Sequence, residues 1–180
     1  MHEHRFHGEP DRLRAPERVV LLEVDRVVQL TLEGITAGTI LDVGTGTGVF
    51  AEAFAKKGFA VTGIDANQEM LDAARRHVSA GQFQQALAEE LPFLEGSFDV
   101  VFLGLVLHET DIPLKALKEA KRVARQRVAM VEWPYRLEDH GPPLEERIRP
   151  ETVARLVHHS GFPGFERILL QNVDFYRLNV

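Results

Sequence analysis

The sequence predicts a doubly wound α/β fold, in which helices cover both faces of a mostly parallel sheet. The first supporting observation is segment 39–50, which has the pattern of a short apolar strand, a glycine-rich turn and a helix start. The second is the alternation of strand and helix patterns that continues beyond this segment. The third is the apolar run 98–108, which is typical of a central parallel strand buried on both faces.

Size and composition favour one domain spanning residues 1–180. The chain is 44% hydrophobic and 27% charged, which suits a single well-buried core. The formal net charge is -6, so the chain has no excess of basic residues to attract a nucleic acid, and we expect no nucleic-acid partner. With neither a long apolar run nor a signal-peptide pattern, we expect a cytoplasmic protein without a membrane partner. The absence of cysteine excludes disulfides, thiolate metal sites and cysteine nucleophiles.

The chain begins with a polar arm over residues 1–16 that carries His2, His4 and His7. Histidines so close to a terminus favour an arm that is flexible or lies over a cleft, rather than a metal site, and we predict no metal. Apolar periodicity then predicts a single helix over residues 17–32. Further helices are expected at 48–57, from Asn67 to near Gly81, at 111–124 and at 151–160.

The strand patterns lie between these helices. We expect strands at 39–43, 60–65, 82–87, 98–108 and 127–133, followed by an antiparallel pair at 165–170 and 174–178.

The glycine spacing in the first turn argues against a dinucleotide cofactor. Gly44, Gly46 and Gly48 stand at i, i+2 and i+4, whereas the dinucleotide fingerprint needs its third glycine at i+5, where this chain has Val49. Three such glycines permit positive φ and close backbone approach, so we expect amide groups and a helix N-terminus to face a ligand.

The segment from Asp42 to Gly48 resembles motif I of the class I S-adenosylmethionine-dependent methyltransferases. The next strand ends at Asp65, about 20 residues past the first glycine, where that family has an acid that holds the ribose hydroxyls. The resemblance covers residues 17–180 and is close to small bacterial proteins of the methyltransferase type 11 group. It implies a seven-stranded sheet of order 3-2-1-4-5-7-6, with the last strand antiparallel.

The resemblance also implies S-adenosylmethionine as cofactor and S-adenosylhomocysteine as product. One position departs from the family pattern, because Leu87 stands where an aspartate usually accepts a hydrogen bond from the adenine amino group. The cofactor-binding residues carried over are Asp42, Gly44, Thr45, Gly46, Gly48, Asp65, Ala66, Met70, Leu87, Ala88, Glu89, Gly104 and Leu105.

His108 is the predicted catalytic residue. Segment 105–109 resembles the stretch after strand four in small-molecule methyltransferases and lacks the motif with which adenine and cytosine amino methyltransferases bind their target. We therefore expect a small-molecule acceptor that attacks the sulfonium methyl in line. His108 is a general base or an orienting group there, or else a hydrogen-bonded turn histidine that supports the loop.

Residues 133–149 form a long connection after the fifth strand. Its apolar anchors and prolines favour an ordered lid over a small acceptor, or else a structural loop or a dimer contact. For the oligomeric state, the sequence is compatible with a monomer and with a homodimer.

Two other functions are compatible with parts of the sequence. One is a non-catalytic relative that binds adenosylmethionine. The other is an NAD(P)-dependent oxidoreductase, which the glycine spacing disfavours, as does the lack of a lysine four residues after Tyr135 or Tyr176.

Overall fold

The structure, a computed structural model, describes residues 10–180 and the side chains from residue 12 onward, so His2, His4 and His7 lie outside it. The helices are α1 (Pro10–Leu13), α2 (Pro16–Leu21), α3 (Val24–Leu32), α4 (Val49–Lys56), α5 (Gln68–His77), α6 (Pro113–Val123) and α7 (Pro150–His159). The strands are β1 (Thr39–Val43), β2 (Ala60–Asp65), β3 (Gln82–Gln85), β4 (Phe98–Gly104), β5 (Ala124–Glu132), β6 (Phe165–Leu169) and β7 (Asp174–Asn179). Two 3₁₀ helices, η1 (Leu107–Glu109) and η2 (Leu144–Glu146), lie in connections.

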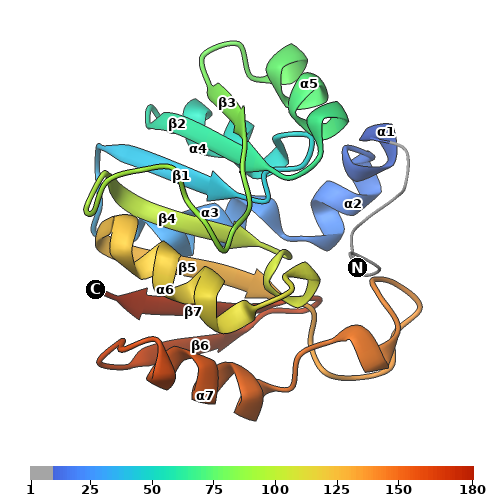
Figure 1. Ribbon diagram of the computed structural model, residues 1–180. Coiled ribbons are helices and arrows are strands. Elements are labelled where there is room, and N and C mark those ends of the chain that lie inside the picture. The colour runs from blue at the N-terminus through green and yellow to red at the C-terminus, as the bar shows by residue number, and fades with distance from the viewer. Residues whose placement is uncertain (1–9) are drawn as a thin grey trace.

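The described strands form one seven-stranded sheet of order β3-β2-β1-β4-β5-β7-β6 (Figure 1). β1 pairs in parallel with both β2 and β4, and β4 pairs in parallel with β5. β7 is antiparallel to both of its neighbours, β5 and β6. The predicted fold class and strand order are therefore confirmed.

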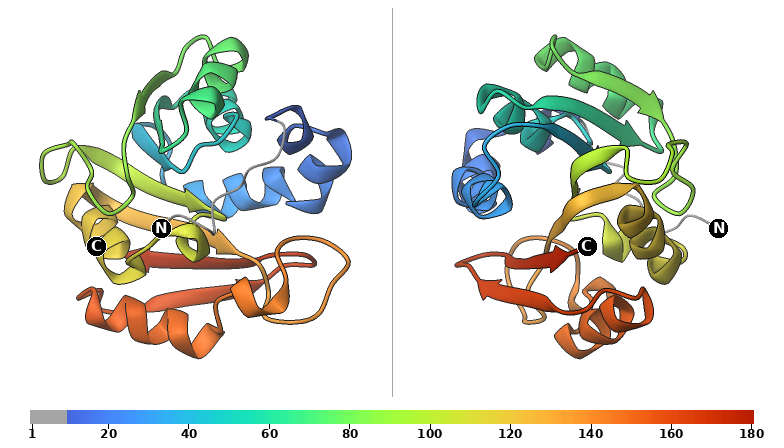
Figure 2. Two further views of the ribbon diagram at one scale, coloured as in Figure 1. Left: turned by 45° about the vertical axis from the view of Figure 1, so that its right-hand side comes forward. Right: turned by 90° about the vertical axis from the view of Figure 1, so that its left-hand side faces the viewer.

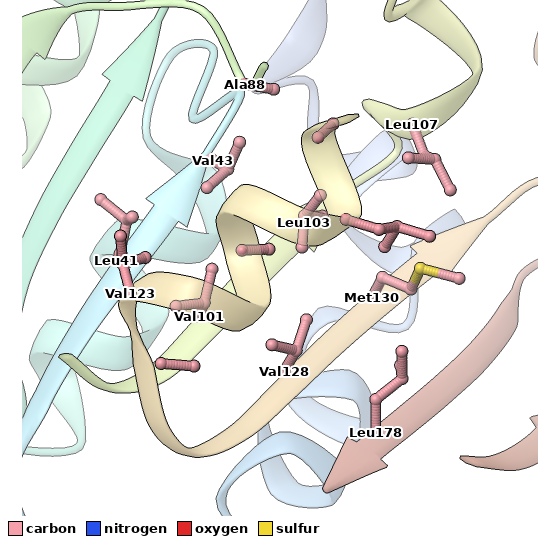
Figure 3. Packing of buried hydrophobic residues seen from close by; sticks show 14 of the residues in the cluster. Leu41, Val43, Ala88, Val101, Leu103, Leu107, Val123, Val128, Met130 and Leu178 are labelled. Carbon is pink, nitrogen blue, oxygen red and sulfur yellow. The ribbon is translucent and has the colours of Figure 1, made fainter. Parts of the chain in front are cut away.

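Helices cover both faces of the sheet, as the right-hand view of Figure 2 shows. On one face, α6 and α7 pack on Leu41, Val101 and Val128 in a cluster that Figure 3 shows from close by. On the other face, α3 and α4 pack on Ile40, Val100 and the rest of a second cluster. Alternate residues of β1 and β4 thus enter opposite cores, which explains why their sequences are apolar throughout.

The predicted helix 17–32 is wrong in one respect, because Glu23 divides it into α2 and α3. Glu23 has a left-handed backbone conformation with φ 49°. Its carboxylate accepts hydrogen bonds from the backbone N–H groups of Gln171, at 2.8 Å, and Asn172, at 3.3 Å. These tertiary contacts offset the strain of a positive φ in a non-glycine residue. The break turns α2 toward the carboxyl ends of the central strands, where Figure 1 shows α1 and α2.

The predicted strand 98–108 is also too long. β4 ends at Gly104, and the chain then turns through Leu105, which has φ 59°, into η1. β3 likewise ends at Gln85 rather than at residue 87. Among the described residues, no helix is long and apolar enough to cross a membrane.

Candidate active site

The glycine turn after β1 allows close backbone packing. Gly44, Gly46 and Gly48 have φ values of +66°, +53° and +80°, which L side chains rarely adopt. A Cβ at Gly44 would lie 2.4 Å from Cγ2 of Val106. Among the described side chains, one at Gly46 would have only Leu13 Cδ1, at 3.5 Å, within contact range. Gly44 therefore lets the loop after β4 approach the turn closely, whereas Gly46 leaves the space above the turn open.

Three amide groups of this turn are bonded within the protein, so these three do not face a ligand as expected. Thr45 N donates to Ile64 O at 2.8 Å, and Gly48 N donates to Thr45 O at 2.9 Å. Gly46 N donates to Oδ2 of Asp65 at 2.8 Å. The turn therefore contributes to the site through its shape and the open space above Gly46, rather than through these three N–H donors.

Asp65 lies at the carboxyl end of β2, as predicted. Besides the bond from Gly46, its Oδ1 accepts a hydrogen bond from Asn67 N at 2.9 Å. These two bonds hold the carboxylate in place between the glycine turn and α5. A carboxylate offers about four acceptor positions, so this arrangement is compatible with further bonds from a vicinal diol. Asn67 also caps α5, because its Oδ1 accepts a hydrogen bond from Glu69 N at 2.9 Å.

A cavity of about 490 Å³ opens at the carboxyl ends of β1, β2 and β4. This volume is within the range usual for small-molecule sites. Twelve of the predicted cofactor-binding residues line it: Asp42, Gly44, Thr45, Gly46, Asp65, Ala66, Met70, Leu87, Ala88, Glu89, Gly104 and Leu105.

Gly48 is the predicted residue that does not line this cavity. A Cβ there would lie 3.1 Å from Val78 Cγ2 and 3.2 Å from Ala74 Cβ, so the glycine allows α4 to begin close against α5.

Other lining residues had no signal in the sequence that marked them as site residues. They come from α1, from α2 and the residue after it, from the glycine turn, from the start of α4 and from the loop after β4, and include Leu13, Arg18, Leu22, Thr47, Phe50, Val106, Glu109 and Thr110. Apart from Thr47, which belongs to the glycine turn, only the tertiary structure brings these residues to the cavity.

Asp42 is a buried carboxyl group beneath the turn. It is 1% exposed and accepts a hydrogen bond from Thr45 Oγ1 at 2.7 Å. Burial raises the pKa of Asp42 to about 7. The hydrogen bond from Thr45 lowers this pKa, whereas the nearby negative charge of Asp65 raises it. A positively charged group bound in the cavity would favour the ionised form of Asp42.

The structure does not place His108 among the cavity-lining residues. Its side chain is 6% exposed, and its Nδ1 lies 2.7 Å from Oε2 of Glu132, the last residue of β5. Burial by itself would lower the pKa of His108, but the charge and hydrogen bond of Glu132, with Glu109 and Glu146, outweigh it and raise the pKa. This arrangement matches the turn histidine that the sequence left as an alternative, and a direct catalytic role stays a prediction.

Residues 133–149 contribute no lining residue to this cavity. Arg147 holds the segment together from within, since its guanidinium donates to the carbonyl oxygens of Pro142, Pro134, Arg136 and His140 and to Glu138. Trp133 is 3% exposed at the start of the segment. The segment lies at the same edge of the sheet as α1 and α2 (Figure 1), and its function as a lid stays a prediction.

The cavity lies between β1 and β4, where the strand order of the sheet reverses. Sheet order and cavity together define the class of protein: an α/β enzyme fold that binds its ligand at the carboxyl ends of parallel strands. A family model described as "Methyltransferase domain" matches residues 41–131. The chain belongs to this family of S-adenosylmethionine-dependent methyltransferases, as the resemblance of its motifs predicted.

Two curated relatives and one solved structure illustrate this similarity. The chain is 32% identical over 108 residues to a demethylmenaquinone methyltransferase of Thermotoga maritima, an alignment that covers 59% of this chain and 47% of the relative. It is 35% identical over 100 residues to a ubiquinone biosynthesis O-methyltransferase of Pseudomonas paraeruginosa, covering 51% of this chain and 42% of the relative. The chain thus matches less than half the length of these curated relatives.

A SAM-dependent methyltransferase from Aquifex aeolicus has the same fold over nearly its whole length. The TM-score is 0.86 at 24% identity, covering 96% of this chain and 99% of that one.

Proposed function

We propose that this protein transfers a methyl group from S-adenosylmethionine to a small-molecule acceptor, and that both bind in the cavity at the carboxyl ends of β1, β2 and β4. The observation that carries the proposal is that one cavity extends from Asp65 and Met70 at one side to Arg18, Glu109 and Thr110. It therefore has room for a cofactor beside an acceptor.

The residues around β1 and β2 fit the cofactor. Asp65 is held where it can accept hydrogen bonds from the ribose hydroxyls, and Gly46 leaves open the space above the turn. Asp42 places a buried carboxyl group under the part of the cavity that would hold the positively charged sulfonium and ammonium groups. Thr47 also lines the cavity, and its buried hydroxyl has no hydrogen-bond partner within the described residues. The cofactor, when bound, supplies the methyl group on its sulfonium.

The acceptor would occupy the end lined by α1, α2, α4 and the loop after β4. Leu13, Leu22, Phe50 and Val106 give this end an apolar character. The names of the two relatives point the same way, because demethylmenaquinone and the precursors of ubiquinone are small molecules. Alignment of the acceptor with the methyl group accounts for most of the expected acceleration in such a site.

In this proposal His108 is an orienting residue. Its bond to Glu132, together with the bond from Leu107 N to Glu132 Oε1 at 2.9 Å, fixes η1 and so places Val106, Glu109 and Thr110 at the cavity.

The test combines calorimetry with an activity screen. We expect S-adenosylhomocysteine and S-adenosylmethionine to bind and NADH not to bind. Methyl transfer is then measured with panels of small phenols, quinols, amines and carboxylic acids. Failure to bind S-adenosylhomocysteine would refute the proposal, whereas binding without transfer to any panel would favour the non-catalytic alternative, for which Leu87 at the adenine end is the main observation.

A further inference from the structure

Arg18 places a guanidinium group in the acceptor end of the cavity. It projects from α2 and lines the same space as Leu13, Leu22 and Phe50. Arg18 is half-buried there, and the carboxylate of Glu109, which lines the same cavity, is close enough to act on its charge.

The position of Arg18 is held by contacts on either side of it along the chain. Before it, Arg14 donates to Thr47 O at 2.8 Å and pairs with Glu52 of α4. After it, Glu23 bonds to the backbone of the β6–β7 connection. The guanidinium carbon of Arg18 lies 5.8 Å from the ring centroid of Trp133. These contacts orient the group without using its N–H donors.

A comparison with Arg147 shows what is unusual about Arg18. The guanidinium of Arg147 lies at the same distance, 5.8 Å, from the Trp133 ring. It also donates to four carbonyl oxygens and one carboxylate, as a buried guanidinium with its five N–H groups requires. Within residues 10–180, by contrast, the side chain of Arg18 makes no hydrogen bond.

The charges that face Arg18 limit what it can bind. Burial lowers the pKa of Arg18, and the negative charge of Glu109 raises it, but an arginine stays protonated at neutral pH. Glu109 lines the same cavity and would repel a second negative charge on a ligand. A carboxylate, with one charge and two oxygens that match the guanidinium fork, fits better than a phosphate dianion.

We propose that Arg18 binds a carboxylate on the methyl acceptor, so that the acceptor is a small apolar or aromatic carboxylic acid. This inference rests on the proposed function, because it assumes that the acceptor occupies this end of the cavity. Arg18 is then a specificity-determining residue, while Leu13, Leu22 and Phe50 contact the apolar body of the acceptor.

Trp133 allows a test that does not depend on turnover, because it is the only tryptophan in the chain. Its fluorescence is titrated with phenylacetate and with phenylacetamide, which has nearly the same shape but no charge, in the presence and absence of S-adenosylhomocysteine. We expect the wild type to bind phenylacetate about tenfold more tightly, because hydrogen bonds to charged groups are the stronger ones. Arg18→Gln should remove this preference.

Arg26→Gln is the matched control, since Arg26 is an exposed arginine on α3 that bonds to Gln29. It changes the net charge equally and should keep the preference. Arg18→Lys should keep part of it, which separates loss of the charge from misfolding of Arg18→Gln. Equal affinity for the two probes in the wild type, no binding of phenylacetate at millimolar concentration, or a preference that survives in Arg18→Gln would overturn the inference. Calorimetry with S-adenosylhomocysteine tests the proposed function separately, so a failure of this inference can be distinguished from a failure of the proposed function.

Discussion

Nδ1 of His108 lies 2.7 Å from Oε2 of Glu132, and this buried pair joins the loop after β4 to the end of β5. Oε1 of the same carboxylate accepts a hydrogen bond from Leu107 N at 2.9 Å. Glu132 therefore holds both the backbone and the side chain of η1. Because the flanking residues Val106 and Glu109 line the cavity, this contact links the stability of the fold to the shape of the site.

Substituting Glu132 should destabilise the protein in a pH-dependent way. The pKa of His108 is raised in the folded state, so the pair contributes its full stability below the unfolded value of about 6.5 and loses it as pH rises through the folded pKa. We expect Glu132→Gln to cost about 1–3 kcal/mol at pH 6 and less at about pH 9. Thermal unfolding at several pH values measures this. Asp72→Asn, at an exposed pair with Arg75, should cost less than about 1 kcal/mol and serves as the control.

His108 can be tested for a catalytic role by separating turnover from stability. If the imidazole takes part in proton transfer, His108→Ala should reduce kcat by roughly 100-fold or more and leave S-adenosylhomocysteine affinity nearly unchanged. If it only positions η1, the variant should lose stability, and His108→Gln should restore part of the activity. Steady-state kinetics and thermal unfolding of both variants distinguish these roles once an acceptor is found. A loss of stability with no kinetic effect would exclude both functional roles.

The affinity for S-adenosylmethionine should increase as pH rises through about 7, which is the raised pKa of Asp42. A cationic ligand favours the ionised carboxylate, so below this pKa binding must also release a proton. S-adenosylhomocysteine carries one positive charge fewer and should show a weaker dependence. In Asp42→Asn the dependence should disappear. Calorimetry in buffers of different ionisation enthalpy measures the released proton, and identical pH profiles for wild type and variant would contradict this prediction.

Asp42 also affects the stability of the free protein. Its folded-state pKa lies above the unfolded value of 3.8, so the folded protein retains a proton that the unfolded chain releases. The stability contribution is present below about pH 4 and is lost as pH rises to about 7. Relative to the wild type, Asp42→Asn should therefore gain stability over this range, as thermal unfolding would show.

Asp65→Ala should weaken S-adenosylhomocysteine binding by about 1–3 kcal/mol, because the ribose hydroxyls would lose their acceptor. Part of this loss should come from the turn itself, since Gly46 N and Asn67 N lose the same carboxylate. Asp65→Asn keeps one oxygen and should lose less. Equal affinity in Asp65→Ala and wild type, measured by calorimetry, would remove Asp65 from the cofactor site.

Leu87→Asp should tighten cofactor binding by about 1 kcal/mol by restoring an acceptor for the adenine amino group. Leu87 lines the cavity and is 41% exposed, so an aspartate there can remain ionised without a large desolvation cost. Leu94→Asp makes the same change at an 83% exposed leucine that does not line the cavity, and should have no effect. Unchanged or weaker binding in Leu87→Asp would place the adenine elsewhere.

The sequence by itself determined the fold and most of the proposed cofactor site. Local patterns suffice for these features. A central strand that is covered on both faces must be apolar throughout, and a turn with positive φ favours glycine. An acid at the end of β2 lies beside that turn once the strands are parallel. Asp42, Gly44, Gly46 and Asp65 accordingly line one cavity, as expected.

Only the tertiary structure decided how the acceptor end is built. The helix break at Glu23 depends on a hydrogen bond to a residue 148 positions away, and apolar periodicity cannot reveal it. Glu132, 24 residues away, directs His108 from the cavity into the protein. Arg18 reaches the site because the break turns α2 over the strands. Each of these features depends on partners distant in sequence, whose positions are fixed only when the whole sheet has formed.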